Sequence, residues 1–178
     1  HIMSSISVVI PVYRSQDSIG LVIQQLAEVL PTLTDTYEAV LVEDNGGDNS
    51  WQVIQRLTQE YTWVRGYQLM RNYGQHSALL CGIRAAQNDI IVTMDDDLQH
   101  PINKVKDLVA LLDDGYDVAY GTPEKEQHGF LRDIASQITK IVLQGAMGAD
   151  TARSISAFRA FRTSLRDAFA DYRGPLVN

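Results

Sequence analysis

Hydrophobic and polar positions alternate between two patterns over the first 120 residues. Five short runs are almost continuously apolar and rich in β-branched residues, the pattern of buried strands. They cover 6–12, 38–43, 64–70, 89–94 and 117–120. Between them, apolar residues recur at helical spacing. These helical segments cover 18–30, 50–61, 77–87 and 101–114. The alternation predicts an α/β fold with a mostly parallel sheet and helices on both faces.

The alternation stops after residue 123. The stretch 131–142 carries an apolar stripe at helical spacing, with Arg132 and Lys140 off the stripe. A helix of this kind either packs on the sheet or presents its apolar face to a membrane surface or a lipid chain. Both interpretations stay open. With no internal repeat or linker in the sequence, we treat 1–178 as a single domain with two parts, 1–123 and 124–178.

Polar segments follow four of the predicted strands. They cover 11–14, 43–45, 71–74 and 95–97. In open α/β sheets, ligands bind outside the carboxyl ends of the strands. We therefore expect these four segments to form one ligand site.

Three adjacent carboxylates, Asp95, Asp96 and Asp97, follow the strand at 89–94. Neighbouring carboxylates repel one another unless a cation is present. Along an extended chain Asp95 and Asp97 point one way and Asp96 the other, and Gln99 returns to the first side. Oxygen ligands of this kind suit Mg²⁺ or Mn²⁺. The alternative is a solvated acidic turn in which Asp97 or a neighbour caps the next helix.

Two further positions have both a functional and an ordinary interpretation. Asp44 can accept hydrogen bonds from a ribose or a base, or it can belong to simple turn chemistry over 44–47. The segment 72–76 precedes a helix, and a helix N-terminus favours phosphate. There His76 is either a ligand or acid, or an ordinary polar residue at a helix start.

The net charge of the chain argues against one class of binding partner. The formal net charge is −7, which argues against a general nucleic-acid binder because phosphate neutralisation needs a basic surface. Residues 1–123 carry a balance of −9 and residues 124–178 a balance of +2. A metal or a local basic cluster would still hold a small anionic substrate. Basic residues of the second part suit a phosphate or an anionic membrane surface, and they include Arg132, Lys140, Arg153, Arg159 and Arg162.

The remaining composition is that of a globular protein with a reduced thiol. The single cysteine, Cys81, excludes an internal disulfide and is expected to be a buried structural thiol. No stretch approaches the roughly 18 apolar residues of a membrane span. His1 and Ile2 precede Met3 as an expected cloning remnant. The abrupt end at 174–178 suggests a piece of a longer protein.

Five motifs together resemble family 2 glycosyltransferases of the GT-A (Rossmann-like) fold, and among them the dolichyl- or polyprenyl-phosphate glycosyltransferases. They are Val9-Ile10-Pro11-Val12-Tyr13, Val42-Glu43-Asp44-Asn45-Gly46-Gly47-Asp48-Asn49-Ser50, Arg71-Asn72-Tyr73-Gly74-Gln75-His76, Met94-Asp95-Asp96-Asp97-Leu98-Gln99-His100-Pro101 and Ser156-Ala157-Phe158-Arg159-Ala160-Phe161-Arg162. The motifs cover most of the chain in the expected order. The acidic triplet followed by Leu-Gln-His-Pro is far more specific than an isolated Asp-x-Asp.

The resemblance implies roles for individual residues. It places Asp95, Asp97 and Gln99 around a Mg²⁺ or Mn²⁺ ion that bridges the donor diphosphate. The implied nucleotide-sugar contacts are Pro11, Val12, Tyr13, Asp44, Asn72, Gly74, Asp95, Asp96 and Ser156. The implied catalytic residues are Asp96, Asp97, Arg132 and Arg159.

Two positions depart from the family pattern. The first loop usually reads Tyr-Asn-Glu, whereas this chain has Tyr13-Arg14-Ser15, so a nucleotide-contacting carboxylate is missing or comes from Asp17. The later segment usually has an acidic residue where this chain has Arg153, and Asp150 is the residue that would substitute for it after a loop shift.

The resemblance implies an inverting, metal-dependent transfer of a sugar from a nucleotide donor, by default a UDP-sugar, to a polyprenyl phosphate. It places a membrane-anchored parent protein on the cytoplasmic side of the membrane, with oligomers possible. Two alternatives stay open: transfer to a saccharide or protein hydroxyl, and a non-catalytic nucleotide-sugar-binding module. The sequence does not identify the sugar.

Overall fold

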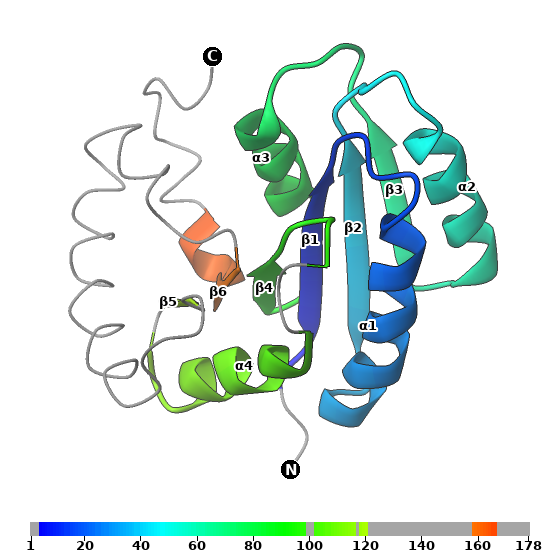
Figure 1. The fold of residues 1–178 in the computed structure, drawn as a ribbon. Helices are drawn as coiled ribbons and strands as arrows, with labels where there is room; N and C mark the ends of the chain where they lie inside the picture. Colours follow the sequence, from blue (N-terminus) through cyan, green and yellow to red (C-terminus); the bar gives the residue numbers. More distant parts are fainter. Residues whose placement is uncertain (1–3, 99–101, 117, 121–157, 167–178) are drawn as a thin grey trace.

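A six-stranded sheet forms the centre of the protein in a computed structural model, which describes residues 4–98, 102–116, 118–120 and 158–166 (Figure 1). The strand order is β3-β2-β1-β4-β6-β5. The strands are β1 (Ile6–Val12), β2 (Tyr37–Glu43), β3 (Val64–Gln68), β4 (Ile90–Thr93), β5 (Val118–Tyr120) and β6 (Arg159–Arg162). This order places the start of the chain at the middle of the sheet.

The first four strands run parallel to one another. β1 pairs with β2 on one side and with β4 on the other, and β2 pairs with β3. β6 is antiparallel to both of its neighbours, β4 and β5. The predicted α/β class with a mostly parallel sheet is therefore confirmed, and the antiparallel strand is an element that the sequence pattern did not predict.

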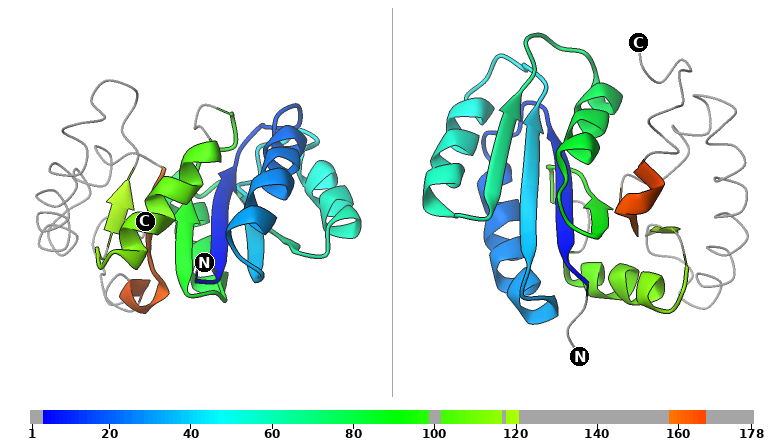
Figure 2. Two further views of the ribbon diagram at one scale, coloured as in Figure 1. Left: turned by 90° about the horizontal axis from the view of Figure 1, so that it is seen from below. Right: turned by 180° about the vertical axis from the view of Figure 1, so that it is seen from behind.

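The helices follow the strands in the predicted alternation. They are α1 (Ile19–Leu33), α2 (Ser50–Glu60), α3 (Gln75–Ala85) and α4 (Val105–Asp113), with 3-10 turns η1 (Ile102–Lys104) and η2 (Thr163–Leu165). α1 lies in front of the sheet in Figure 1 and α3 in front of it in the reverse view of Figure 2. Helices thus cover both faces of the sheet. The stretch 131–142 lies outside the described residues.

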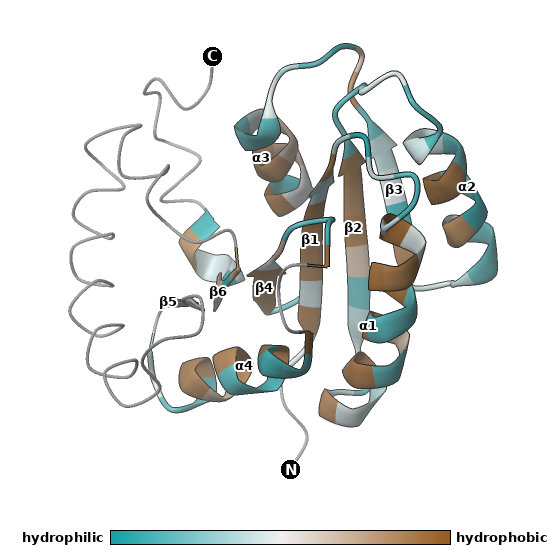
Figure 3. Cartoon of the chain, viewed as in Figure 1, coloured by the Kyte–Doolittle hydropathy of each residue, from teal (hydrophilic) through white to brown (hydrophobic). Residues whose placement is uncertain are grey.

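Side chains from both faces of the sheet form the core. Every residue of β1 is buried, and the mostly brown strands β1 and β2 in Figure 3 show how continuous this hydrophobic layer is. α1 adds the apolar stripe that the sequence predicted. Its buried members are Ile19, Val22, Ile23, Leu26, Leu30 and Leu33. Each of the four helices buries apolar side chains against this layer, as expected of amphipathic helices.

A buried polar network closes the amino end of the sheet. Glu38 accepts hydrogen bonds from Ser7 Oγ at 2.6 Å, from Gln87 N at 2.7 Å and from Arg65 Nε at 2.9 Å. Arg65 Nη2 lies 2.7 Å from the same carboxylate, which is an ion pair. These partners satisfy the buried charge. Glu38 is therefore a structural residue at the edge opposite the four polar segments.

Candidate functional site

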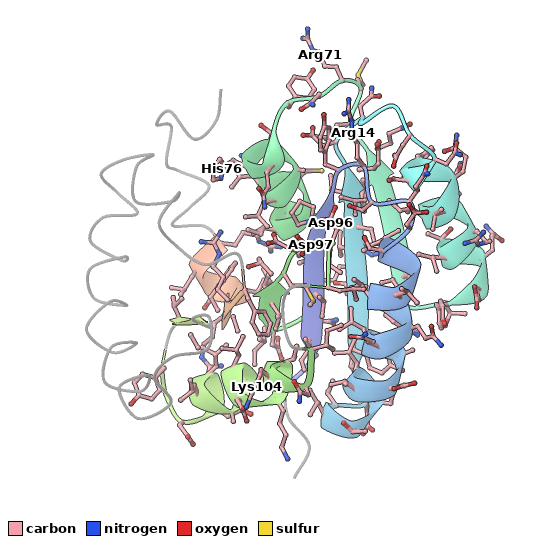
Figure 4. All side chains as sticks on the ribbon, viewed as in Figure 1. Arg14, Arg71, His76, Asp96, Asp97 and Lys104 are labelled. Carbon is pink, nitrogen blue, oxygen red and sulfur yellow. The ribbon has the colours of Figure 1, made fainter. Side chains whose placement is uncertain are left out.

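The loops that follow β1, β2 and β3 meet the segment after β4 at the carboxyl edge of the sheet. Figure 4 shows Arg14, Arg71, Asp96 and Asp97 toward this edge, and Lys104 at the opposite end. Backbone hydrogen bonds extend the strands into the site, from Asp44 N to Val12 O at 2.9 Å and from Met94 N to Val9 O at 3.1 Å. The expected gathering of polar segments at one edge is therefore confirmed.

Asp95 and Asp97 follow β4 with different exposure. Asp95 is half-buried and accepts a hydrogen bond from Gln75 Nε2, at the start of α3, at 3.2 Å, whereas Asp97 is exposed. Two carboxylates on an exposed edge supply hard oxygen ligands of the kind that Mg²⁺ and Mn²⁺ accept. Within the described ranges no group of three His, Cys, Asp or Glu side chains gathers around a common point. A metal held by Asp95 and Asp97 is therefore still a prediction from the sequence.

Asp96 faces the loop between β1 and α1. Its Oδ2 accepts hydrogen bonds from the backbone N–H of Tyr13 at 2.8 Å and from the hydroxyl of Ser15. The backbone oxygen of Asp96 accepts a hydrogen bond from Ser18 Oγ at 2.6 Å. The triplet thus contains one carboxylate that is engaged with protein backbone.

Glu43 and Asp44, at the end of β2, also bind backbone N–H groups. The two oxygens of Glu43 accept from Asn45 N and Gly46 N, each at 2.9 Å. The two oxygens of Asp44 accept from Tyr73 N and Gly74 N, again each at 2.9 Å. Asp44 is only 3% exposed. Glu43 therefore shapes its own loop, and Asp44 fixes the loop before α3.

The loops after β1 and β2 pack directly against each other. Arg14 Nε donates to Gly46 O at 3.0 Å, and Ser15 N donates to Ser50 Oγ at 2.8 Å. A Cβ on Gly46 would lie 2.9 Å from Arg14 Cγ, so only glycine fits this approach. Arg14 itself has φ 51°, a left-handed conformation that few side chains adopt. The contact fixes the two loops relative to each other.

Asp48 lies in the same pair of loops, and hydrogen bonds lower the pKa of its carboxyl more than burial raises it. Burial raises the pKa of this carboxyl, but hydrogen bonds from Ser50 and from the backbone of Gln16 lower it, and the net pKa lies below its usual value. Asp48 Oδ1 accepts from Ser50 N at 3.0 Å, at the start of α2. The charged carboxylate thus stabilises the beginning of α2.

The family model described as "Glycosyl transferase family 2" matches residues 7–172. The chain belongs to glycosyl transferase family 2. The predicted resemblance is confirmed, and with it the assignment of the chain to the glycosyltransferase enzymes.

A curated relative narrows the comparison within family 2. The chain is 33% identical over 167 residues to the undecaprenyl-phosphate 4-deoxy-4-formamido-L-arabinose transferase of Yersinia enterocolitica. The match covers 93% of this chain and 51% of the relative, so the chain spans about half the length of that protein. This relative is a polyprenyl-phosphate glycosyltransferase by name, as the sequence resemblance led us to expect.

Solved structures support the GT-A fold of this family 2 chain. The mannosyltransferase PcManGT of Pyrobaculum calidifontis, in complex with GDP-Man and Mn²⁺, has a TM-score of 0.67 at 16% identity, covering 94% of this chain and 47% of its own. TarS of S. aureus in complex with UDP has a TM-score of 0.63 at 20% identity, covering 94% and 49%. At these identities the likeness shows the fold alone.

The predicted nucleotide-sugar contacts of this family 2 chain differ in their burial and in their place in the structure. Pro11 and Val12 are buried within β1, whereas the ring of Tyr13 is 43% exposed. A side-chain contact from this segment to a ligand is therefore left to Tyr13. Asn72 and Gly74 lie in the loop that Asp44 holds. Gln99, Arg132 and Ser156 lie outside the described residues.

The two arginines of β6 lie at opposite ends of that strand. Arg159 pairs with Thr93 at the carboxyl end of β4, beside the acidic triplet. Arg162 pairs with Ile90 at the other end and donates from Nη2 to Leu112 O at 2.6 Å. The suitability of both arginines for a phosphate or an anionic membrane surface stays a prediction. Arg159 is the one of the two that lies at the carboxyl end of β4.

Other expectations about single residues can be compared directly. Asp17 is exposed, in the loop where Ser15 is buried. Lys104 is the N-cap residue of α4, and no side-chain hydrogen bond caps that helix. Residues 99–101, between Asp97 and η1, lie outside the described residues, so the alternative of a cap from Asp97 or a neighbour stays a prediction. Cys81 is half-buried rather than buried, and burial raises the pKa of its thiol. None of the helices in the described part of the chain is long and apolar enough to cross a membrane.

Several residues that shape the site had no predicted role of their own there. Glu43, Ser15, Ser50 and Gln75 all contact loop backbone or acidic side chains there. The signal for Glu43 was available, because a carboxylate that ends an apolar strand must find donors once it is buried. The serines carry no comparable signal.

Proposed function

We propose that this chain contributes the donor site and reaction centre of an inverting, metal-dependent glycosyltransferase that moves a sugar from a nucleotide donor to polyprenyl phosphate. The observation that carries the proposal is the pair Asp95 and Asp97 at the carboxyl edge, beside loops that three other carboxylates anchor. The relative named as an undecaprenyl-phosphate transferase supports the acceptor class. The Mn²⁺ complex of a neighbour with the same fold supports the use of a metal.

The donor is held by residues of both parts of the chain. Asp95 and Asp97, with Gln99, hold Mg²⁺ or Mn²⁺, which when bound neutralises the charge that develops on the leaving nucleoside diphosphate. Tyr13 offers its exposed ring to the base. Arg159 at the end of β6 adds a positive charge for the phosphates, and Arg132 and Ser156 complete the predicted set.

A phosphate acceptor needs no general base from the chain. A phosphate monoester is already ionised near pH 7, so its oxygen attacks the anomeric carbon without first losing a proton. The new bond from that oxygen to carbon forms as the bond to the diphosphate breaks, and the diphosphate leaves with the electron pair. Attack opposite the leaving group inverts the anomeric centre. A hydroxyl acceptor would instead need a base.

The proposed acceptor implies that the enzyme acts at a membrane surface. A polyprenyl phosphate is embedded in a bilayer, so the site must work at a membrane surface, and a nucleotide-sugar donor places that surface on the cytoplasmic side. The second part of the chain, with its balance of +2, suits an anionic surface better than the first.

Calorimetry with UDP and with GDP tests the donor site. We expect either nucleotide to bind more tightly with Mn²⁺ than with EDTA, by about tenfold or more, and Asp97→Asn to abolish the difference. Asp35→Asn is the matched control, because Asp35 is an exposed carboxylate between α1 and β2 at the other edge of the sheet. Equal affinity with and without metal in the wild-type chain would overturn the metal-dependent donor site.

Product analysis tests the acceptor. The chain is incubated with labelled nucleotide sugars and undecaprenyl phosphate in detergent, and the lipid extract is separated from the aqueous phase. Label in the lipid fraction that is released by mild acid is the expected result. Label found only on added saccharide or protein would replace the phosphate acceptor with a hydroxyl.

A further inference from the structure

The side chain of Asp96 binds the loop between β1 and α1. One oxygen, Oδ2, accepts both the Tyr13 N–H at 2.8 Å and the Ser15 hydroxyl. The Ser18 hydroxyl binds the backbone oxygen of the same residue at 2.6 Å. Three donors from one short loop thus converge on a single residue at the end of β4.

The β1–α1 loop also binds the β2–α2 loop. Ser15 N donates to Ser50 Oγ at 2.8 Å, and Arg14 Nε donates to Gly46 O at 3.0 Å. Ser15 is 8% exposed, so its hydrogen bonds form away from most of the solvent. Asp96 therefore lies at the head of a chain of contacts that runs from β4 through the β1–α1 loop to the β2–α2 loop.

We propose that Asp96 is a positioning residue, which holds the β1–α1 loop and with it the Tyr13 ring in place, and that it is not a metal ligand. The carboxylate acts as an acceptor for two donors, so its geometry matters more than its charge. The proposed metal is assigned to Asp95 and Asp97. The proposal goes beyond the proposed function in dividing the triplet by role, and it rests on that function only where the loop meets the nucleotide.

An isosteric pair of variants separates the two roles. Asp96→Asn removes the charge but keeps an oxygen that accepts from Tyr13 N and Ser15 Oγ, whereas Asp96→Ala removes the acceptor. Hydrogen–deuterium exchange is measured on the wild-type chain and on both variants without any ligand. We expect exchange over residues 13–18 to be on the order of tenfold faster in Asp96→Ala and close to the wild-type rate in Asp96→Asn. Unchanged exchange over 13–18 in Asp96→Ala would overturn the proposal.

A binding experiment adds a readout that a purely structural defect would not give. UDP affinity is measured with Mn²⁺ and with EDTA. Asp96→Ala should weaken UDP by a similar factor in both conditions, and Asp96→Asn should keep the gain that Mn²⁺ provides. Asp97→Asn should lose that gain while keeping the affinity in EDTA. A loss of the Mn²⁺ gain in Asp96→Asn would make Asp96 a metal ligand and contradict the proposal.

The two experiments keep this inference separate from the proposed function. If wild-type UDP and GDP binding show no metal dependence, the donor-site proposal fails, and the exchange measurement still decides the role of Asp96. Ser15→Ala provides a graded control, because it removes one of the two donors to Oδ2 and leaves the Tyr13 N–H in place. Its exchange over 13–18 should lie between the wild-type rate and that of Asp96→Ala.

Discussion

Gly74 donates its backbone N–H to Oδ2 of Asp44 at 2.9 Å while its own φ is 98°. The carboxylate at the end of β2 thus selects the backbone conformation of the residue before α3. Glycine adopts a positive φ without the penalty that a Cβ imposes. The pair fixes where α3 begins and how the loop from Arg71 to Gly74 faces the site.

Asp44→Ala should destabilise the protein by about 1–2 kcal/mol, because it removes the acceptor of the Tyr73 N–H and one of the two acceptors of the Gly74 N–H, the other being Asn72 Oδ1 at 3.1 Å. Urea unfolding measures the change, and Asp35→Ala, at an exposed carboxylate, is the control. A loss in Asp44→Ala no larger than that in the control would show that the two hydrogen bonds contribute little.

Gly74→Ala tests the backbone half of the same relationship. Nothing lies within 4 Å of a Cβ at this position, so steric contact adds no cost. We expect a destabilisation of about 1–3 kcal/mol from the backbone conformation alone, because φ 98° with ψ 161° is a combination that essentially only glycine adopts. Urea unfolding of this variant should show no change in the slope of the transition, and a neutral effect would mean that φ relaxes at no cost.

Gly82→Ala should destabilise the protein by about 1–3 kcal/mol through overpacking. A Cβ at Gly82 would lie 2.4 Å from Val9 Cγ1 and 3.2 Å from Val42 Cγ2, where α3 packs on the sheet. The matched control is Gly20→Ala in α1, where nothing lies within 4 Å of the added carbon. The control should be neutral or stabilising by about 0.4–1 kcal/mol. Thermal unfolding of both variants measures the contrast, and equal effects would argue against a close contact at Gly82.

The lowered pKa of Asp48 predicts that the contribution of this carboxylate to the free energy of unfolding depends on pH. Its pKa is lower in the folded chain than its usual value, so its stabilising contribution is complete above the usual value and is lost as the pH falls through the folded value. The difference in unfolding free energy between wild type and Asp48→Asn should therefore shrink as the pH is lowered from 7 to about 3. Urea titrations at several pH values measure it. A difference that is constant over this range would contradict the lowered pKa.

Cys81 should react slowly with alkylating reagents near neutral pH. Burial raises the pKa of its thiol more than the nearby charge of Arg84 lowers it, so little thiolate is present. Iodoacetamide labelling followed by mass spectrometry should show slower modification of the native chain than of the chain in urea at the same pH. Equal rates would show that neither burial nor the raised pKa protects the thiol.

The sequence pattern predicted most of the fold because the strands of the parallel part are nearly continuous apolar runs. The predicted strand 6–12 coincides with β1, and the helix expected from residue 50 begins there as α2. β6 escaped prediction because a four-residue strand with an arginine at each end has too little pattern of its own. Its antiparallel place depends on partners that are distant along the chain.

The location of the candidate site at one edge of the sheet was predicted, but the contacts of its individual side chains were not. Strand ends and acidic residues identify the edge of the sheet, since that follows from chain order. Chain order does not predict which of these carboxylates bind backbone N–H groups. Asp44 and Asp96 turn toward backbone N–H groups because of loop geometry that involves Gly74 and Ser15, and no local pattern encodes that geometry.

The position of β6 has a consequence for synthesis of the chain. β6 lies between β4 and β5, so until residues 159–162 have left the ribosome β4 is paired only with β1, and β5 lacks its partner in the sheet. Until then β4 presents an unpaired apolar edge of the kind that promotes aggregation. Shortened products that end near residue 123 should therefore be insoluble, even though they contain every carboxylate of the donor site.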